Sequence, residues 1–324
     1  MRFSHARIVV LLLCVFAAGL GASQRFKFSQ AGNYPGATYT VPLAVGEKNI
    51  VGYYEAPELW SGYIQTGTTF EAIAPPGSPS SYVGGINRHG EMVGGFCDDG
   101  CNPITGMHGF TYDHGSYTTI DYPNLPMGSS TTAYGINNLG QIVGGYCLKA
   151  PNCPSGLDGT PTHGYLDDNG VFTTIDYPGA VATGASAIND AGAIVGTYDI
   201  NLTGPHSFLY QNGVYTNIDF PNANFTVATA ITNQGIVGGY YTTLSGIEYG
   251  FEYQNLTFTT IQANGASETS LNGLSDAGVI VGFWESPRET SRAFPLTTRP
   301  SKPARFPAPV KSCPGIRSSQ KRRS

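Results

Sequence analysis

One short motif, an aliphatic pair followed by glycine, recurs six times and constrains the fold of this 324-residue chain more than any other feature. The copies are Ile50–Gly52, Met92–Gly94, Ile142–Gly144, Ile194–Gly196, Ile236–Gly238 and Ile280–Gly282. Successive copies lie 42, 50, 52, 42 and 44 residues apart. Repeats of this length form stacked supersecondary units, among them the blades of β-propellers.

Each repeat predicts four short strands. In the third copy, a turn at Asn138-Leu139-Gly140 and a hairpin at Asp167–Gly170 separate strands at residues 132–137, 141–147, 163–166 and 171–177. Four antiparallel strands per unit is the composition of a propeller blade. The low charged fraction of 12% and the 43 glycines fit short strands joined by tight turns.

The two ends of the chain complement each other. The sixth copy stops after Phe294-Pro295-Leu296 without a fourth strand, whereas Phe26–Ser29 followed by Tyr34-Pro35-Gly36 resembles a fourth strand. We therefore predict an all-β fold: a single six-bladed β-propeller of four-stranded antiparallel blades, closed by an N-terminal strand. In this arrangement residues 25–30 pair beside residues 290–297, which leaves no open sheet edge.

Three segments differ in composition. Residues 1–23 read as a secretory signal peptide, with Arg2, His5 and Arg7 before an apolar run at residues 8–18 that is too short to span a membrane. Residues 24–298 hold the repeats. Residues 299–324 contain eight Lys or Arg and no acidic residue, and we expect a disordered basic tail rich in Pro and Ser. We therefore expect a secreted, periplasmic or cell-envelope protein without a membrane span.

Charge argues against nucleic acid as a partner. Without the tail and the signal peptide, seven basic residues face 22 acidic ones, so the repeat domain carries a net charge of about −15. Binding to phosphate backbones needs clustered Lys and Arg. We expect a monomer that binds a glycan or a surface protein.

Four cysteines occupy equivalent places after the second strands of neighbouring units. They form two close pairs, Cys97 with Cys101 and Cys147 with Cys153. In an exported chain we expect each pair to form a loop disulfide. A four-thiolate zinc site is the alternative, but its usual spacing is tighter. Cys313, in the tail, has no expected partner.

The repeated phrases resemble the HAF family of bacterial exported repeat proteins, over roughly residues 80–295. The resemblance rests on the Gly-Ile-Asn sequences before the second and third motif copies (residues 85–87 and 135–137), on His108-Gly109-Phe110, and on Thr173–Gly179. It implies an extracellular or envelope-associated bacterial protein of unassigned activity. It implies no catalytic residues.

Histidine and aspartate recur at fixed places in the repeat. His108, His163 and His206 begin third strands, where other copies have Tyr249 and Arg292. A position that accepts Tyr is expected to be structural. Asp121, Asp176 and Asp219 precede an aromatic-Pro turn, where Asp can bond its own backbone.

The candidate ligand residues lie where the repeat varies. An aromatic ends each second strand (Tyr54, Phe96, Tyr146, Tyr198, Tyr240 and Trp284), and the residue that follows it differs between copies. We select Trp60, Trp284, Tyr241, Glu55 and Glu285 as candidates, because aromatic rings beside acids suit sugars.

The chain carries none of the motifs of common hydrolases, phosphate sites or calcium loops, so we predict no catalytic residue, metal or cofactor. The preferred function is a non-enzymatic binding or interaction module. The alternative is a polysaccharide hydrolase or lyase built from two distant carboxylates, such as Glu55 and Glu285.

Overall fold

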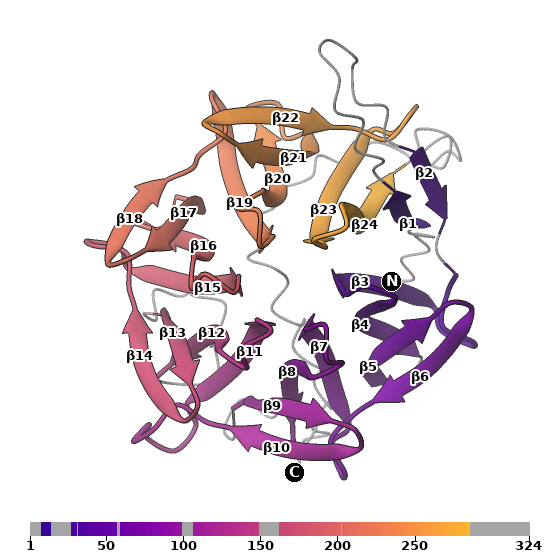
Figure 1. Cartoon of the computed structure of the whole chain (residues 1–324), viewed down its shortest axis with the longest axis vertical. Helices are drawn as coiled ribbons and strands as arrows, with labels where there is room; N and C mark the ends of the chain where they lie inside the picture. The colour runs from indigo at the N-terminus through magenta and orange to yellow at the C-terminus, as the bar shows by residue number, and fades with distance from the viewer. Residues whose placement is uncertain are drawn as a thin grey trace, which may run out of the picture.

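Every regular element in the described part of the chain is a β-strand. The computed structural model describes residues 8–13, 27–30, 32–56, 59–98, 106–148, 162–201 and 203–285. The predicted all-β class is confirmed. Figure 1 shows the sheets set radially around a central axis, with one edge strand of each sheet innermost.

The strands pair almost entirely with their neighbours in sequence. Three sheets follow chain order. They are β3(Tyr39–Val45), β4(Asn49–Ala56), β5(Leu59–Thr66), β6(Thr69–Ile73); β7(Ser80–Ile86), β8(Met92–Cys97), β9(His108–Asp113), β10(Ser116–Ile120); and β19(Ala223–Ile231), β20(Val237–Thr243), β21(Glu248–Gln254), β22(Thr257–Ile261). The predicted four-stranded antiparallel units are confirmed here.

Two further units are joined in one eight-stranded sheet, so the expectation of separate blades throughout is only partly met. The strands are β11(Ser130–Ile136), β12(Ile142–Cys147), β13(Thr162–Asp168), β14(Val171–Ile175), β15(Ala182–Ile188), β16(Ile194–Asp199), β17(His206–Gln211) and β18(Val214–Asn217). A single parallel bridge between Thr162 and Ala182 connects the two halves. Within each half the pairing is antiparallel.

The last sheet combines both ends of the described chain, but not as predicted. Its order is β2-β1-β24-β23, where β1 is Ile8–Leu13, β2 is Lys27–Gln30, β23 is Glu268–Leu274 and β24 is Val279–Glu285. Residues 27–30 pair with β1, and β1 pairs with β24. The prediction that residues 25–30 pair beside residues 290–297 is therefore wrong, because residues 27–30 pair with β1 instead. Residues 290–297 lie outside the described residues.

The core explains the recurring glycine. In four units this glycine pairs across the sheet with an aromatic residue of the third strand, and in the fifth unit the next residue, Gly239, does so. Those aromatic side chains are at most 1% exposed: Tyr63, Phe110, Tyr165, Phe208 and Phe251. A methyl group added at Gly144 would collide with the Thr132 carbonyl oxygen and lie 2.8 Å from Tyr165 Cε1. Only glycine leaves room for the ring.

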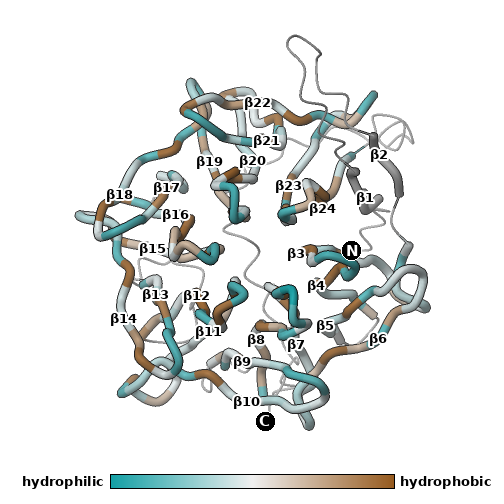
Figure 2. The backbone as a smooth tube through the Cα atoms, in the orientation of Figure 1, coloured by the Kyte–Doolittle hydropathy of each residue, from teal (hydrophilic) through white to brown (hydrophobic). Residues whose placement is uncertain are grey.

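Hydrophobic and polar residues separate along the radius of the ring. Apolar clusters lie between successive units, as where Val143 and Ile175 pack with Ala185 and Phe208. Figure 2 shows hydrophilic residues at the innermost turns and hydrophobic stretches along the strands.

Candidate functional site

The antiparallel order of each unit creates two faces. We call the side with the connections between first and second strands, and between third and fourth strands, the turn face. The opposite side, the loop face, carries the connections between second and third strands and those that lead to the next unit. All five predicted ligand residues, together with Cys97 and Cys147, fall at or beside the loop face.

On the turn face, a repeated asparagine links three of the units each to the next one. Asn137 Oδ1 accepts from the backbone amides of Leu139 and Gln141, each at 3.0 Å, which holds its own turn. Its Nδ2 donates to the Asn189 carbonyl of the next unit at 3.0 Å. Asn87 and Asn189 repeat this pattern. These side chains are therefore committed to the fold.

The next residue of each turn forms a second circuit. The Arg88 amide donates to Asn138 Oδ1 at 2.9 Å, and the Asn138 amide donates to Asp190 Oδ1 at 2.8 Å. Asn233 Nδ2 donates to both Asp190 and Asp276, at 2.9 and 2.8 Å. Although partial burial opposes ionisation, the hydrogen bonds from Asn138 and Asn233 hold the pKa of Asp190 below its usual value.

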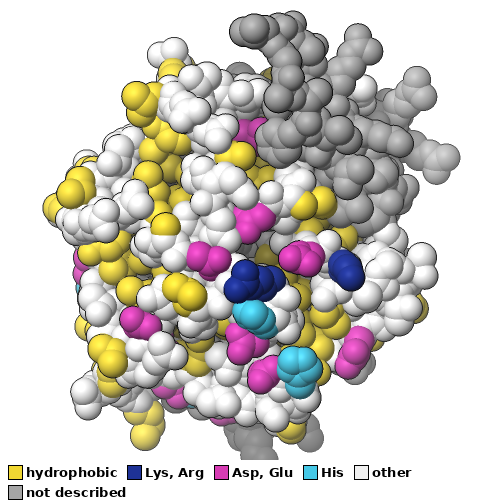
Figure 3. All heavy atoms as spheres, in the orientation of Figure 1, with side chains coloured by type: hydrophobic (Ala, Val, Ile, Leu, Met, Phe, Trp, Pro, Cys, Tyr) yellow, Lys and Arg dark blue, Asp and Glu magenta, His cyan; other side chains and the backbone are white. Residues whose placement is uncertain are grey.

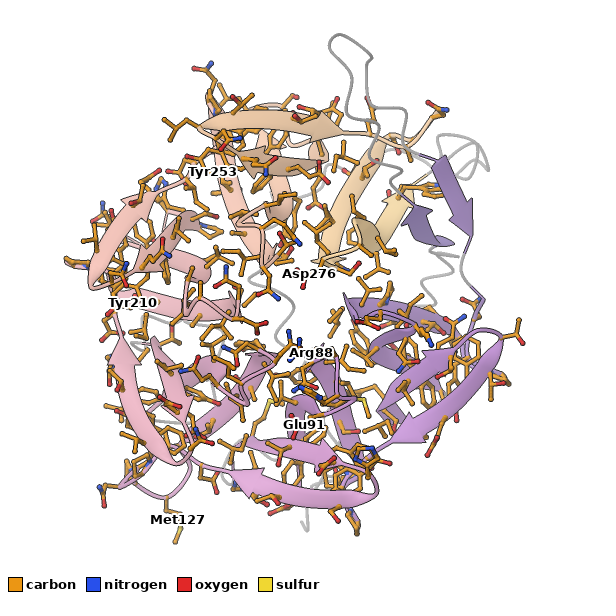
Figure 4. All side chains as sticks on the ribbon, viewed as in Figure 1. Arg88, Glu91, Met127, Tyr210, Tyr253 and Asp276 are labelled. Carbon is orange, nitrogen blue, oxygen red and sulfur yellow. The ribbon has the colours of Figure 1, made fainter. Side chains whose placement is uncertain are left out.

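Charged side chains collect where these circuits surround the axis. Figure 4 shows Arg88 and Asp276 at the inner rim of the ring, and Figure 3 shows basic and acidic side chains gathered around the centre of the same face. Opposite charges are interspersed there. The rim therefore presents a mixed field and offers no single-sign attraction for a charged polymer.

On the loop face, the recurring histidines and aspartates pair with each other. His108 Nδ1 lies 2.7 Å from Asp121, His163 Nδ1 lies 2.8 Å from Asp176, and His206 Nδ1 lies 2.7 Å from Asp219. These bonds to Asp raise the pKa of His108 and of His163, against the smaller opposing effect of burial. The expected structural role fits these contacts. Sequence reasoning missed the pairing, although both partners are 13 residues apart in all three copies.

Aromatic stacks connect these pairs from unit to unit. Tyr177, next to Asp176, stacks on Tyr198 of the following unit with ring centroids 3.6 Å apart and planes 4° from parallel. The Tyr198 ring in turn packs on His206 at 5.3 Å. Tyr122 with Tyr146, and Phe220 with Tyr241, repeat the stack. The aromatics that end second strands thus fill the seams between units.

The stacking corrects one predicted residue. The motif match placed Tyr240 in the aromatic position of the fifth unit, but Tyr241 makes the stack with Phe220. The register agrees, because Tyr241 pairs with Thr226 as Tyr146 pairs with Thr131. Tyr241 is 7% exposed, and its hydroxyl lies 3.2 Å from Thr260 Oγ1. This candidate ligand residue is a packing residue.

Glu55 and Trp60 are brought together. They are directly paired across β4 and β5, at the end of both strands that meets the loop face. Trp60 packs partly buried against the cluster of Tyr82, Cys97 and Met107. Its indole nitrogen is buried without a hydrogen-bond partner among the described residues.

Trp284 and Glu285 end β24 on the same face. They pair with Thr269 and Glu268 of β23. The Glu285 carbonyl accepts from the Ser267 amide at 2.8 Å, so the backbone at this position is fixed. The units of Glu55 and Glu285 are neighbours, since Asn272 of β23 donates to the Pro42 carbonyl of β3 at 2.9 Å.

Cys97 and Cys147 occupy equivalent positions as the last residues of β8 and β12, and both are fully buried. Cys101 and Cys153 lie outside the described residues, so the two disulfides stay predictions. Within the described ranges, no group of three or more His, Cys, Asp or Glu side chains is arranged to hold a metal ion.

Six of the ten large hydrophobic side chains that are exposed in the described part of the chain lie on the loop face, and the other four (Leu139, Val171, Val214 and Leu256) lie on the turn face. The six on the loop face come from its connections in several successive units: Met127, Leu148, Val181, Ile200, Leu244 and Ile247. Met127 is 99% exposed and protrudes from the rim in Figure 4. Exposed apolar side chains mark an interaction surface where they form a contiguous patch.

Comparison with known proteins gives the fold. No protein-family model and no curated protein matches the chain. Among solved structures, a putative TolB from Agrobacterium tumefaciens is 9% identical, with a TM-score of 0.56, over 90% of this chain and all of that one. TolB from Acinetobacter baumannii is 9% identical, with a TM-score of 0.49, over 74% and 64% of the two chains.

The structural similarity to a lectin is weaker. The Aleuria aurantia lectin, solved with Fucα1-6GlcNAc, is 11% identical with a TM-score of 0.42, over 73% of this chain and 87% of the lectin. At these identities the likeness shows a β-propeller-like fold alone. In the part of the chain that the structure describes, no helix has the length and apolar character needed to cross a membrane.

Proposed function

We propose that this chain is an exported, monomeric, non-enzymatic binding module of the bacterial envelope or exterior, which contacts its ligand through the loop face. The observation that carries the proposal is that exposed aliphatic side chains from several successive units lie on the same face as the His–Asp pairs. On the turn face, the side chains of the repeated asparagines already form hydrogen bonds between units. The loop face is therefore the surface left for recognition.

A glycan is the ligand class that this surface fits best. Asp121 and Asp176 are 52% and 43% exposed, and each orients a histidine that is itself 26% exposed. Fixed carboxylates and imidazole nitrogens can accept and donate hydrogen bonds to sugar hydroxyls. Neighbouring aliphatic side chains can cover the apolar faces of a sugar ring.

A glycan array with the purified exported protein tests this function. The variant Leu244→Asp alters a residue of the loop face that is 81% exposed, and Leu256→Asp alters a residue of a turn-face hairpin that is 86% exposed. We expect the first variant to lose binding and the second to keep it. Equal effects of the two variants would contradict a ligand on the loop face.

A reducing-sugar release assay on the same glycans separates binding from catalysis. We expect binding without release. Release that disappears in Glu285→Gln would show a polysaccharide-acting enzyme instead. A glycan array without any signal would point to a surface protein as the partner.

We further propose that the sheets form a six-bladed ring whose last blade is completed from the N-terminal part of the chain. Support comes from Tyr34, which follows β2 as Tyr177 follows β14. The Tyr34 amide donates to Thr40 Oγ1 at 2.8 Å, and the Tyr177 amide donates to Thr183 Oγ1 at 3.1 Å. Tyr34 also stacks on Tyr54 at 3.7 Å.

Two loop disulfides, Cys97–Cys101 and Cys147–Cys153, complete the proposal. Buried cysteines at the same place in two units suit staples for the loops that follow them. Mass spectrometry of the non-reduced exported protein should find both short crosslinked peptides. Four free thiols with bound zinc would instead support a metal site.

A further inference from the structure

The strand that pairs with β24 lacks the aromatic residue that the third strand carries in the other units. In five units a glycine of the second strand pairs with a buried aromatic of the third strand, as in Gly196 with Phe208 and Gly239 with Phe251. In the last unit, Gly282 pairs with Val10 of β1. The third-strand position there is held by a segment without an aromatic at the equivalent register.

That segment is also the one we expect the protein to lose. Strand β1, Ile8–Leu13, coincides with the apolar core of the predicted signal peptide. Cleavage after Ala22 or Ser23 would remove it and leave the edge of β24 with unpaired backbone amides and carbonyls. An open edge of this kind recruits another strand.

The sequence after β24 contains a matching replacement. Phe294 lies 12 residues after Gly282, the same separation that joins Gly196 to Phe208 and Gly239 to Phe251. Arg292-Ala293-Phe294 therefore falls at the register of His206-Ser207-Phe208. A connection of this length already closes two second-to-third-strand hairpins in the structure.

We propose that the edge of β24 is a docking site for residues 290–297 of the same chain, and that the signal peptide and this segment compete for it. In the precursor β1 occupies the edge. After cleavage residues 290–297 pair with β24 and place Phe294 beside Gly282. The last unit then gains the buried aromatic that the other five possess.

Hydrogen exchange followed by mass spectrometry tests the exchange of strands. The exported protein, with its N-terminus determined by sequencing, is compared with the uncleaved precursor retained in the cytoplasm. We expect amides of residues 290–297 to exchange at least ~100-fold more slowly in the exported protein, as for other core strands. Equal exchange in the two forms, or an exported protein that keeps residues 8–13, would overturn the proposal.

A pair of matched substitutions gives an independent readout. Phe294→Ala should lower the Tm of the exported protein by roughly 6–12 °C, as expected for loss of a buried ring, and should change the Tm of the precursor much less. Phe306→Ala, in the basic tail, should leave both Tm values unchanged. If the two variants behave alike in the exported protein, residues 290–297 do not occupy this edge.

Discussion

Two adjacent glycines of β12, Gly144 and Gly145, predict opposite responses to the same substitution. A methyl group at Gly144 would collide with the Thr132 carbonyl oxygen and meet the buried Tyr165 ring at 2.8 Å. A methyl group at Gly145 would find its nearest neighbour, Tyr134 Cε2, at 3.5 Å. Both glycines have ordinary extended backbone, so the comparison isolates the effect of space.

We expect Gly144→Ala to lower the free energy of unfolding by about 3 kcal/mol, because backbone and a fully buried ring must both move. This corresponds to a Tm lower by roughly 6–12 °C for a domain of this size. Gly145→Ala should change stability by less than about 1 kcal/mol. Urea and thermal unfolding followed by circular dichroism measure both. Similar losses in the two variants would refute the role assigned to the recurring glycine.

Two other contacts make further predictions. Because its bond to Asp176 raises the pKa of His163, the pair stabilises the fold fully below the unfolded pKa and loses this effect as the pH rises through the folded pKa. The pair is partly exposed, so His163→Asn should remove about 0.2–1 kcal/mol at pH 5.5 and little at pH 8.5 in urea unfolding; an unchanged pH dependence would contradict this. Asn138→Ala should cost about 1–2 kcal/mol, because it removes the bond that Asn138 Nδ2 donates to Asp190 and the Oδ1 that accepts from the Arg88 amide, whereas Leu139→Ala, 59% exposed in the same turn, should be neutral. Equal unfolding midpoints for the two alanine variants would contradict the circuit.

The strands were predictable because the local signals repeat and agree. The hairpin at Asp167–Gly170 and the turn at Asn138–Gly140 lie where the sequence placed them, between β13 and β14 and between β11 and β12. Alternation and turn residues act within a few positions, so a single copy suffices to locate them. Six copies in the same order then leave few alternatives to a radial array.

The fifth unit shows where motif matching fails. Ile236–Gly238 copies the letters of Ile142–Gly144, yet Val237 pairs with Ile231 as Ile142 pairs with Ile136. The turn glycine is the better reference for aligning the units, since Val237 follows Gly235 by two residues, as Ile142 follows Gly140. Aligning on turn glycines would have identified Tyr241 as the stacking residue.

Contacts between units were less predictable than the units themselves. The asparagine circuits join residues about 43 to 52 positions apart, and their partners are defined only once neighbouring turns face each other. The same holds for the N-terminal strands. Composition assigned residues 8–13 to a signal peptide, whereas β24 pairs with them as a strand. A short apolar run fits both a signal-peptide core and a buried β-strand, so sequence alone does not distinguish the two.

The residue that follows the aromatic at the end of each second strand is where a ligand site is best sought. This position is occupied by Glu55, Cys97, Cys147, Asp199, Thr242 and Glu285. Both cysteines are buried, and Asp199 is used by its own loop, where it accepts from the amides of Asn201 and Gly204 at 2.9 Å. Glu55 and Glu285 remain partly exposed, in neighbouring units linked by the bond from Asn272 to Pro42. If an acidic pair on the loop face selects the ligand, the seam between these two units is where it acts.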